Sequence, residues 1–208
     1  MTKTSNNKPI YGRNHMGKYS LWIDWETTGA DFDSGLTTKK YQGISFGAII
    51  ADNETFTEVA SIYRELHFDD TKYQWTNGAE KIHGLSREYL KEHGVPREDA
   101  LADLLAMISD YLGANGKIMI GGHNVWFDID FTTQLTMDCA GITLDLHHVK
   151  LETSALGFIT TGVYKSNELF QLFGADAREK HNALDDARQA LAVARGIKQL
   201  IQIGLDAS

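Results

Sequence analysis

The sequence has little of what disulfide-bonded, secreted or membrane-spanning proteins need. It contains one cysteine, Cys139, among 208 residues, so no internal disulfide can form. We find no signal peptide at the start and no apolar run of about 18 residues, the length that predicts a transmembrane helix. We therefore expect a protein of the reducing cytoplasm that has no membrane association.

Basic residues are also scarce. Lysine and arginine together number 20 against 28 acidic residues, which gives a net charge of -8. This balance argues against a protein that holds long nucleic acid on a broad electropositive surface. It does not exclude an enzyme that acts on nucleic acid, because acids gathered around cations in one pocket add negative charge without making the whole surface negative.

The composition is otherwise that of a globular domain. Hydrophobic residues make up 42% of the chain and charged residues 23%, and 208 residues suit one domain of ordinary size. Residues 1–18 are polar and aperiodic, which predicts a flexible N-terminal arm. We expect residues 19–208 to form a single domain.

Hydrophobic periodicity predicts a mixed α/β fold. Alternation begins at Tyr19 and predicts a strand, and apolar runs at residues 43–51 and 58–66 complete a three-strand meander. The period then changes. Helices are expected at 100–112, 125–140, 166–174 and 183–201, with strands at 117–122 and 142–151. One mixed sheet flanked by helices accounts for this order.

Acidic residues interrupt the first strand. Asp24 and Glu26 point to the same face because side chains alternate along a strand. Two carboxylates so close repel one another unless a cation or a proton lies between them. A solvent-exposed sheet edge would explain the pair as well, so this pattern alone leaves its role open.

Two later segments supply further candidates. Asp128 lies in the first turn of a helix that follows a buried strand, where α/β sheets place ligands. Asp186 lies in the first turn of the last helix, and His181 precedes that helix, with a side chain that can take a proton from water near neutral pH. The simpler alternatives are acids that only favour a helix dipole and a histidine on the surface.

The three segments together resemble a known family. "IDWETTG", "GHNVWFD" and "HNALDDA" are similar, in this order, to the three motifs of the DEDDh exonucleases, which include DnaQ-like and ribonuclease T-like 3′-5′ exonucleases. The likeness runs from about residue 19 to 200. "KIHGLSREYL" also resembles the H-G-L segment that family members carry between the first two motifs, and would place Ile82, His83 and Gly84 beside the substrate channel.

The resemblance implies an RNase H-like fold and a metal-dependent nuclease that removes nucleoside 5′-monophosphates from the 3′ end of single-stranded DNA or RNA. It implies four catalytic, metal-binding acids, which are Asp24, Glu26, Asp128 and Asp186, with His181 as general base. The family spacing of five residues from the histidine selects Asp186 over Asp185. Hard oxygen ligands suit two Mg²⁺ or Mn²⁺ ions, and two such ions can activate water and neutralise a leaving oxygen.

Further residues are candidates for binding the nucleic acid. They are Thr27, Thr28, Gly29, His83, Asn124, Trp126 and Phe127. Aromatic rings can stack on any base, although Trp25 and Phe131 are expected in the core. The segment 27–29 has an alternative reading as a plain exit from the strand.

Other functions remain open at this point. One alternative is a proofreading-type exonuclease subunit that acts in a complex with a polymerase or another protein, and a homodimer is also compatible with the sequence. A second is a non-catalytic nucleic-acid-binding module. The presence of all four acids and His181 disfavours the second alternative.

Overall fold

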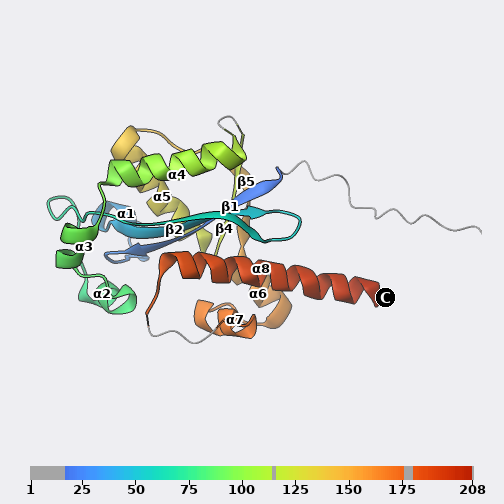
Figure 1. The fold of residues 1–208 in the computed structure, drawn as a ribbon. Coiled ribbons are helices and arrows are strands. Elements are labelled where there is room, and N and C mark those ends of the chain that lie inside the picture. Colours follow the sequence, from blue (N-terminus) through green and yellow to red (C-terminus); the bar gives the residue numbers. More distant parts are fainter. Residues whose placement is uncertain (1–16, 114–115, 176–179, 208) are drawn as a thin grey trace, which may run out of the picture.

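The computed structural model describes residues 17–113, 116–175 and 180–207. Within them a five-stranded sheet has the order β3-β2-β1-β4-β5 (Figure 1). The strands are β1 (Tyr19–Thr27), β2 (Gly43–Asp52), β3 (Glu58–Glu65), β4 (Ile118–Gly122) and β5 (Leu146–Glu152). The first three strands are antiparallel, whereas β4 is parallel to β1 and β5 is parallel to β4. The predicted meander with added parallel strands is confirmed.

Helices connect and cover the strands. They are α1 (Thr37–Lys40), α2 (Asn77–His83), α3 (Arg87–His93), α4 (Arg97–Leu112), α5 (Val125–Ala140), α6 (Thr153–Thr161), α7 (Ser166–Leu172) and α8 (Ala183–Asp206). The four predicted helices correspond to α4, α5, α7 and α8. None of the helices in this described part combines the length and apolar character that crossing a bilayer requires.

The sequence pattern misplaced some boundaries and missed four helices. The last strand begins at Leu146 rather than at residue 142. The helices α1, α2, α3 and α6 were not predicted, because each spans only four to nine residues and so shows too few turns for a periodic signal.

Most of the predicted N-terminal arm, residues 1–16, lies outside the described residues. The carbonyl oxygens of Gly17 and Lys18 accept hydrogen bonds from the Asn53 side-chain amide (2.7 Å) and main-chain N–H (2.9 Å). The end of that segment is therefore attached to the turn between β2 and β3.

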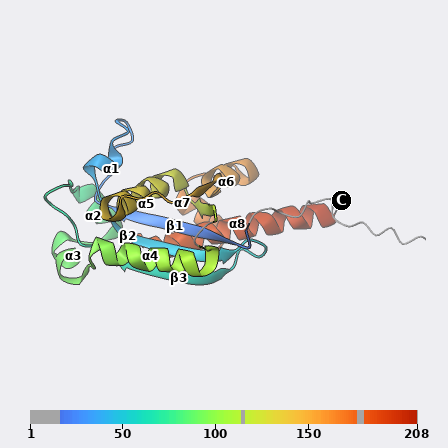
Figure 2. The same cartoon turned by 90° about the horizontal axis from the view of Figure 1, so that it is seen from above.

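Two cores lie on opposite faces of the sheet. Leu21, Ile23 and Trp25 of β1 belong to the core that α4 and α5 cover, whereas Trp22 belongs to the core beneath α8. Figure 1 shows α4 above the sheet and α8 below it, and Figure 2 shows α4 and α5 covering the same face. The predicted alternation of β1 therefore holds, and Asp24 and Glu26 share their side of the strand with Trp22.

A glycine lets α8 approach the sheet closely. A Cβ atom on Gly47 of β2 would lie 2.1 Å from the Cα of Leu184 and 2.5 Å from the carbonyl carbon of Ala183. A side chain there would push the first turn of α8 away from the sheet. Gly47 pairs directly with Asp24, so this contact brings the start of α8 to the acids of β1.

Candidate active site

The acids of β1 lie where the strand ends. Asp24 is half-buried, and Glu26 is 7% exposed. The pairing of β1 with β2 shifts between Glu26 and Thr27, an irregularity of the kind that often lies beside active sites. The strand thus delivers two carboxylates to one end of the sheet.

Asp128 reaches this end of the sheet from the first turn of α5. Its Oδ1 accepts a hydrogen bond from the Trp25 main-chain N–H at 3.0 Å, which ties α5 to β1 between the two acids. The side chain is buried, and this burial raises the pKa of Asp128 well above its usual value. The nearby negative charges of Glu26 and Glu152 raise this pKa further.

The start of α8 brings a fourth carboxylate and the histidine. The Asn182 side chain caps α8 by accepting hydrogen bonds from the N–H groups of Leu184 (3.1 Å) and Asp185 (3.2 Å). Asp186 is 4% exposed, and its Oδ2 lies 3.1 Å from Nδ1 of His181. The cap therefore fixes the turn that faces the acids of β1.

Asp185 differs from Asp186 in its surroundings. Asp185 is exposed, and its carboxylate lies 3.5 Å from Nη1 of Arg188 on the outer side of α8. The geometry thus favours Asp186 as the acid of the site, in line with the choice that the family spacing predicts.

Glu26, His181 and Asp186 form a compact group of potential ligands. One ligand atom from each lies within 4.8 Å of the others. Asp128 approaches the group closely enough for the charge of Glu26 to raise its pKa, and Asp24 lies on the same side of β1. The donor set is mostly carboxylate oxygen, which fits a hard divalent cation such as Mg²⁺ or Mn²⁺.

The segment that follows Glu26 is held by the rest of the chain. Thr27 donates its hydroxyl hydrogen to the Gly29 carbonyl (3.0 Å), and Gly29 is buried against the Tyr41 ring. Thr28 is fully buried; its N–H donates to the Gln42 carbonyl (2.9 Å), and its hydroxyl accepts from the Gln42 N–H (3.0 Å). The N–H of Thr28 is therefore used inside the protein.

The H-G-L segment lies next to His181. The Ile82 carbonyl accepts a hydrogen bond from the His181 N–H at 3.1 Å, and the Ile82 side chain is exposed. His83 is buried with its ring edge-on to Trp75, and burial lowers the pKa of His83. Nδ1 of His83 accepts the Leu85 N–H at 3.0 Å, so the ring is held within the H-G-L segment.

Aromatic side chains surround a cavity next to the first turn of α5, which carries Asp128. Trp126 is 59% exposed, and Phe32 is 74% exposed with its ring 5.8 Å from that of half-buried Phe127. These rings line a cavity of about 270 Å³ together with Asn124. The sequence reasoning missed Phe32, although a single aromatic residue in a polar, turn-rich loop after the first motif was a usable signal. Phe127 also contacts buried Phe131, which is in the core as expected.

Asn124 has an unusual backbone that a second missed residue stabilises. Its φ is +55°, a conformation that side-chain-bearing residues rarely adopt, and its N–H donates to Glu152 Oε1 at 2.8 Å. Glu152 also accepts from the N–H groups of Ser154 and Ala155. Burial opposes ionisation of Glu152, but the hydrogen bonds from these three residues lower its pKa overall. An acid just before "TS" at a helix start was the available signal.

A mixed sheet in which β1, α5 and α8 bring acids together beside a histidine defines a nuclease of the RNase H-like, DEDDh type. Residues 21–194 match the family model of the RNase T exonucleases. The chain belongs to this exonuclease family. Divalent metal ions are typical of the family.

Solved structures with low sequence identity share the fold. The nuclease domain of 3′hExo, a DEDDh family member bound to rAMP, has a TM-score of 0.68 and 14% identity, and the match covers 88% of this chain and 92% of that one. Exonuclease I of E. coli, in complex with a dT13 oligonucleotide, has a TM-score of 0.69 and 18% identity. That match covers 92% of this chain but 43% of Exonuclease I, so the chain spans less than half of that protein. No curated protein sequence matches the chain significantly.

Proposed function

We propose that the protein is a 3′-to-5′ exonuclease that releases nucleoside 5′-monophosphates from single-stranded DNA or RNA. The observation that carries this proposal is the convergence of Glu26, His181 and Asp186 within 4.8 Å, beside buried Asp128. The similar structures were solved with rAMP and with a dT13 oligonucleotide, which supports a single-stranded substrate.

The four acids are the proposed holders of two divalent cations, Mg²⁺ or Mn²⁺. Asp24, Glu26, Asp128 and Asp186 offer the oxygen donors that such ions prefer. The raised pKa of Asp128 supports this assignment, because a bound cation would compensate for the burial and the repulsion that disfavour its charged form. When bound, the two ions would activate a water molecule and neutralise the leaving 3′-oxygen.

His181 is the proposed general base. Its Nδ1 faces Asp186 Oδ2 at 3.1 Å, a contact that orients the ring and favours a proton on Nδ1. The proton taken from the attacking water would then go to Nε2. The side chain is 30% exposed, so water can reach the ring while the main chain is held by Ile82.

The aromatic cavity is the proposed contact for the bases at the 3′ end. Trp126 and Phe32 are largely exposed, and the Phe127 ring lies 5.8 Å from that of Phe32. Stacking on such rings requires bases that are not already stacked in a duplex, which supports single-stranded substrates. Lys150 Nζ lies 5.5 Å from the Trp126 ring centre and adds a positive charge beside it.

The direct test is a nuclease assay on four polymers. Single- and double-stranded DNA and RNA, each labelled at the 5′ end, are incubated with Mg²⁺, Mn²⁺ or a chelator. We expect a ladder of 5′-labelled fragments that shortens from the 3′ end, unlabelled nucleoside 5′-monophosphates detected by chromatography, and no reaction with chelator. Immediate release of the label as a mononucleotide, or internal cuts alone, would contradict the proposal.

Neighbouring acids in α8 offer a matched pair of variants. Asp186→Asn should abolish turnover, whereas Asp185→Asn should leave it within about twofold of the wild type, because Asp185 faces solvent. His181→Ala should lower kcat by about 10²- to 10⁴-fold through loss of the general base. Normal turnover in the His181 variant would show that the base is another group.

A further inference from the structure

We propose that helix α2 acts as a strut that positions His181, and that Thr76, at the start of α2, is a positioning residue for this base. The inference rests on the proposed function, because it assigns to α2 a role in the reaction of His181. It concerns a helix that the sequence pattern did not predict and that supplies none of the four acids. Three sets of contacts carry it.

The first set attaches the start of α2 to the end of β1. The Thr76 N–H and hydroxyl both donate to the Thr28 carbonyl, at 2.8 and 3.0 Å. The same hydroxyl accepts from the Ala79 N–H at 3.3 Å and so caps α2. Thr28 is itself fixed, because it is fully buried and bonded to Gln42 in both directions. The main-chain N–H and the hydroxyl of Thr76 therefore together join the start of the helix to a buried residue that follows β1.

The second set attaches the end of α2 to the segment of His181. The Ile82 carbonyl, in the last turn of α2, accepts the His181 N–H at 3.1 Å. Gly84 ends the helix with φ +75°, and a Cβ atom there would lie 2.6 Å from Nζ and 2.7 Å from Cδ of Lys180. The lack of a side chain at Gly84 thus leaves room for the Lys180 side chain against the end of the helix.

The third set fixes α2 along its length. The Trp75 indole N–H donates to Glu80 Oε2 at 2.7 Å, and the Trp75 ring meets that of buried His83 edge-on, with centroids 6.0 Å apart. Arg87 lies over the same indole, 5.4 Å from the ring centre. The helix is thereby packed against its own flanking segments at both ends.

This connection matters because His181 lies outside α8, whose cap is Asn182. The ring is held by Asp186 on one side, and the main chain is held by Ile82 on the other. Proton transfer needs heavy atoms about 2.6–3.2 Å apart, and a shift of about 1 Å can lower a rate by about 10²-fold. A seven-residue helix is marginal by itself, so its cap decides whether the Ile82 carbonyl stays in place.

The test compares two caps on neighbouring helices of the full chain. Thr76→Val removes the hydroxyl while keeping the shape, and Thr76→Ser restores it. Ser86→Ala is the matched control, because Ser86 caps the seven-residue helix α3 through the Tyr89 N–H at 3.1 Å. We expect Thr76→Val to lower kcat about 10- to 100-fold with KM within about twofold, Thr76→Ser to recover most of the loss, and Ser86→Ala to match the wild type. Thr76→Ala is the second variant if the valine variant does not fold.

Two further readouts separate positioning from a general loss of structure. In the background of His181→Ala, Thr76→Val should produce no further loss of kcat, because the residue it positions is gone. Amide hydrogen exchange of the peptide that contains His181 should be faster in Thr76→Val than in the wild type or in Ser86→Ala. Equal effects of the valine and Ser86 variants, or independent losses for Thr76→Val and His181→Ala, would overturn the inference.

The exchange measurement also decides the inference if the proposed function fails. A wild-type protein that hydrolyses none of the four polymers would contradict the exonuclease proposal. Faster exchange at His181 in Thr76→Val would still support the strut, and unchanged exchange would overturn it.

Discussion

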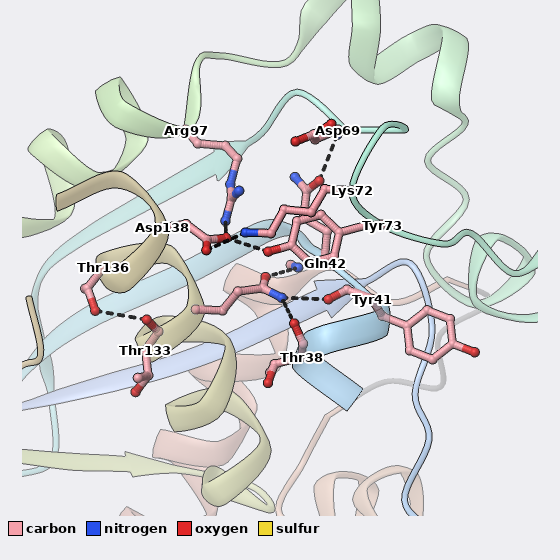
Figure 3. Close-up of polar contacts among 12 residues, drawn as sticks. Thr38, Tyr41, Gln42, Asp69, Lys72, Tyr73, Arg97, Thr133, Thr136 and Asp138 are labelled. Atoms are coloured by element: carbon pink, nitrogen blue, oxygen red, sulfur yellow. Dashed lines mark hydrogen bonds and ion pairs between the residues drawn. The ribbon is translucent and has the colours of Figure 1, made fainter. Parts of the chain in front are cut away.

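The two ends of helix α5 carry acids in opposite electrostatic situations. Asp138, in the last turn, accepts from Lys72 Nζ at 2.6 Å, from Arg97 Nη2 at 2.9 Å and from the Tyr73 hydroxyl (Figure 3). Burial alone would raise the pKa of Asp138, but these three donors lower it overall. Asp128, in the first turn, accepts the Trp25 N–H, and burial raises its pKa.

The difference shows that one helix can hold a carboxylate whose charged form is favoured at one end and a carboxylate whose neutral form is favoured at the other. The donors of Asp138 come from the segment between β3 and α2 and from α4, so its charge holds separate parts of the chain together. Burial opposes the charge of Asp128 most strongly, and the charges of Glu26 and Glu152 oppose it further. Neighbouring donors thus favour the charged form of Asp138, whereas the surroundings of Asp128 favour its neutral form.

Side-chain amides extend the structural end of this comparison. Gln134 of α5 donates to the carbonyls of Thr38 (2.6 Å) and Tyr41 (2.7 Å) and accepts from the Gly43 N–H (3.2 Å). Gln42 accepts from the Asp69 N–H at 2.8 Å (Figure 3). The loop after β1 and the segment before α2 are thus both attached to the far part of α5, away from the acids of the site.

We expect the greatest loss of activity when Asp128, the proposed metal ligand in the first turn of α5, is neutralised. Asp128→Asn should lower kcat by about 10³-fold or more, because the reaction loses a proposed ligand of its cations. In chelator the free energy of unfolding should stay equal or rise by up to about 1 kcal/mol, because Asn can still accept the Trp25 N–H while the repulsion with Glu26 disappears. Urea unfolding with and without Mg²⁺ measures both states.

The Asp128→Asn variant also tests whether Mg²⁺ binding stabilises the protein through Asp128. Wild-type protein should gain about 1.4 kcal/mol at a Mg²⁺ concentration ten times Kd, and Asp128→Asn should lose most of this gain. A variant that unfolds more than about 2 kcal/mol more easily in chelator would show that the Asp128 charge stabilises the fold, and the contrast with Asp138 would be wrong.

Neutralising Asp138, in the last turn of α5, should lower stability and leave turnover nearly unchanged. Asp138→Asn should lower the free energy of unfolding by about 2–3 kcal/mol, because Arg97 and Lys72 lose their carboxylate. We expect kcat to stay within about threefold of the wild type, since Asp138 is at the far end of α5 from the site. A large loss of turnover in a protein that unfolds normally would remove the distinction between the two ends.

The contribution of Asp138 to stability should depend on pH. Because the folded pKa of Asp138 lies below its unfolded value, its stabilisation is complete above about pH 4–5 and is lost as pH falls through the folded pKa. The difference in unfolding free energy between wild type and Asp138→Asn should therefore shrink between about pH 5 and pH 2. Urea titrations at several pH values measure it, and a difference that stays constant would contradict the assigned ion pairs.

Exposed side chains at the two ends of α5 should have a modest influence on substrate binding. Trp126→Ala should raise KM for a single-stranded oligonucleotide about tenfold with kcat little changed, because one stacking contact is lost. Met137→Ala is the control, since Met137 is also exposed but lies near the other end of α5. Equal KM values for the two variants would remove Trp126 from the substrate path.

Much of this architecture could be predicted from the sequence because it depends on local periodicity. The alternation that begins at Tyr19 correctly placed Leu21 and Trp22 on opposite sides of β1, and the helix expected at 125–140 is α5. The spacing of the last motif selected Asp186, and the structure places that residue, not Asp185, against His181. Such patterns are local, so neighbouring residues along the chain contain the whole signal.

Other features escaped prediction because they depend on contacts between distant segments. In the sequence Gly47 is simply a glycine within an apolar strand. Its importance appears only in the fold, where the first turn of α8 packs directly on it. Phe32 and Glu152 become site residues only through Phe127 and Asn124, which lie far away in the sequence. The short helix α2 has no periodic signal and is recognisable by its bonds to Thr28 and His181.

Residue type and spacing along the chain were enough to predict the succession of strands and long helices, the side of β1 on which the acids lie, and the side chains proposed as oxygen donors, because all of these are local properties. The three-dimensional fold was needed to see that the pKa of Asp128 is raised whereas that of Asp138 is lowered. It was also needed to see that the Ile82 carbonyl, at the end of α2, holds the main chain of His181. Burial and neighbouring charges set the pKa of a carboxylate, and both are made by parts of the chain that the fold brings together.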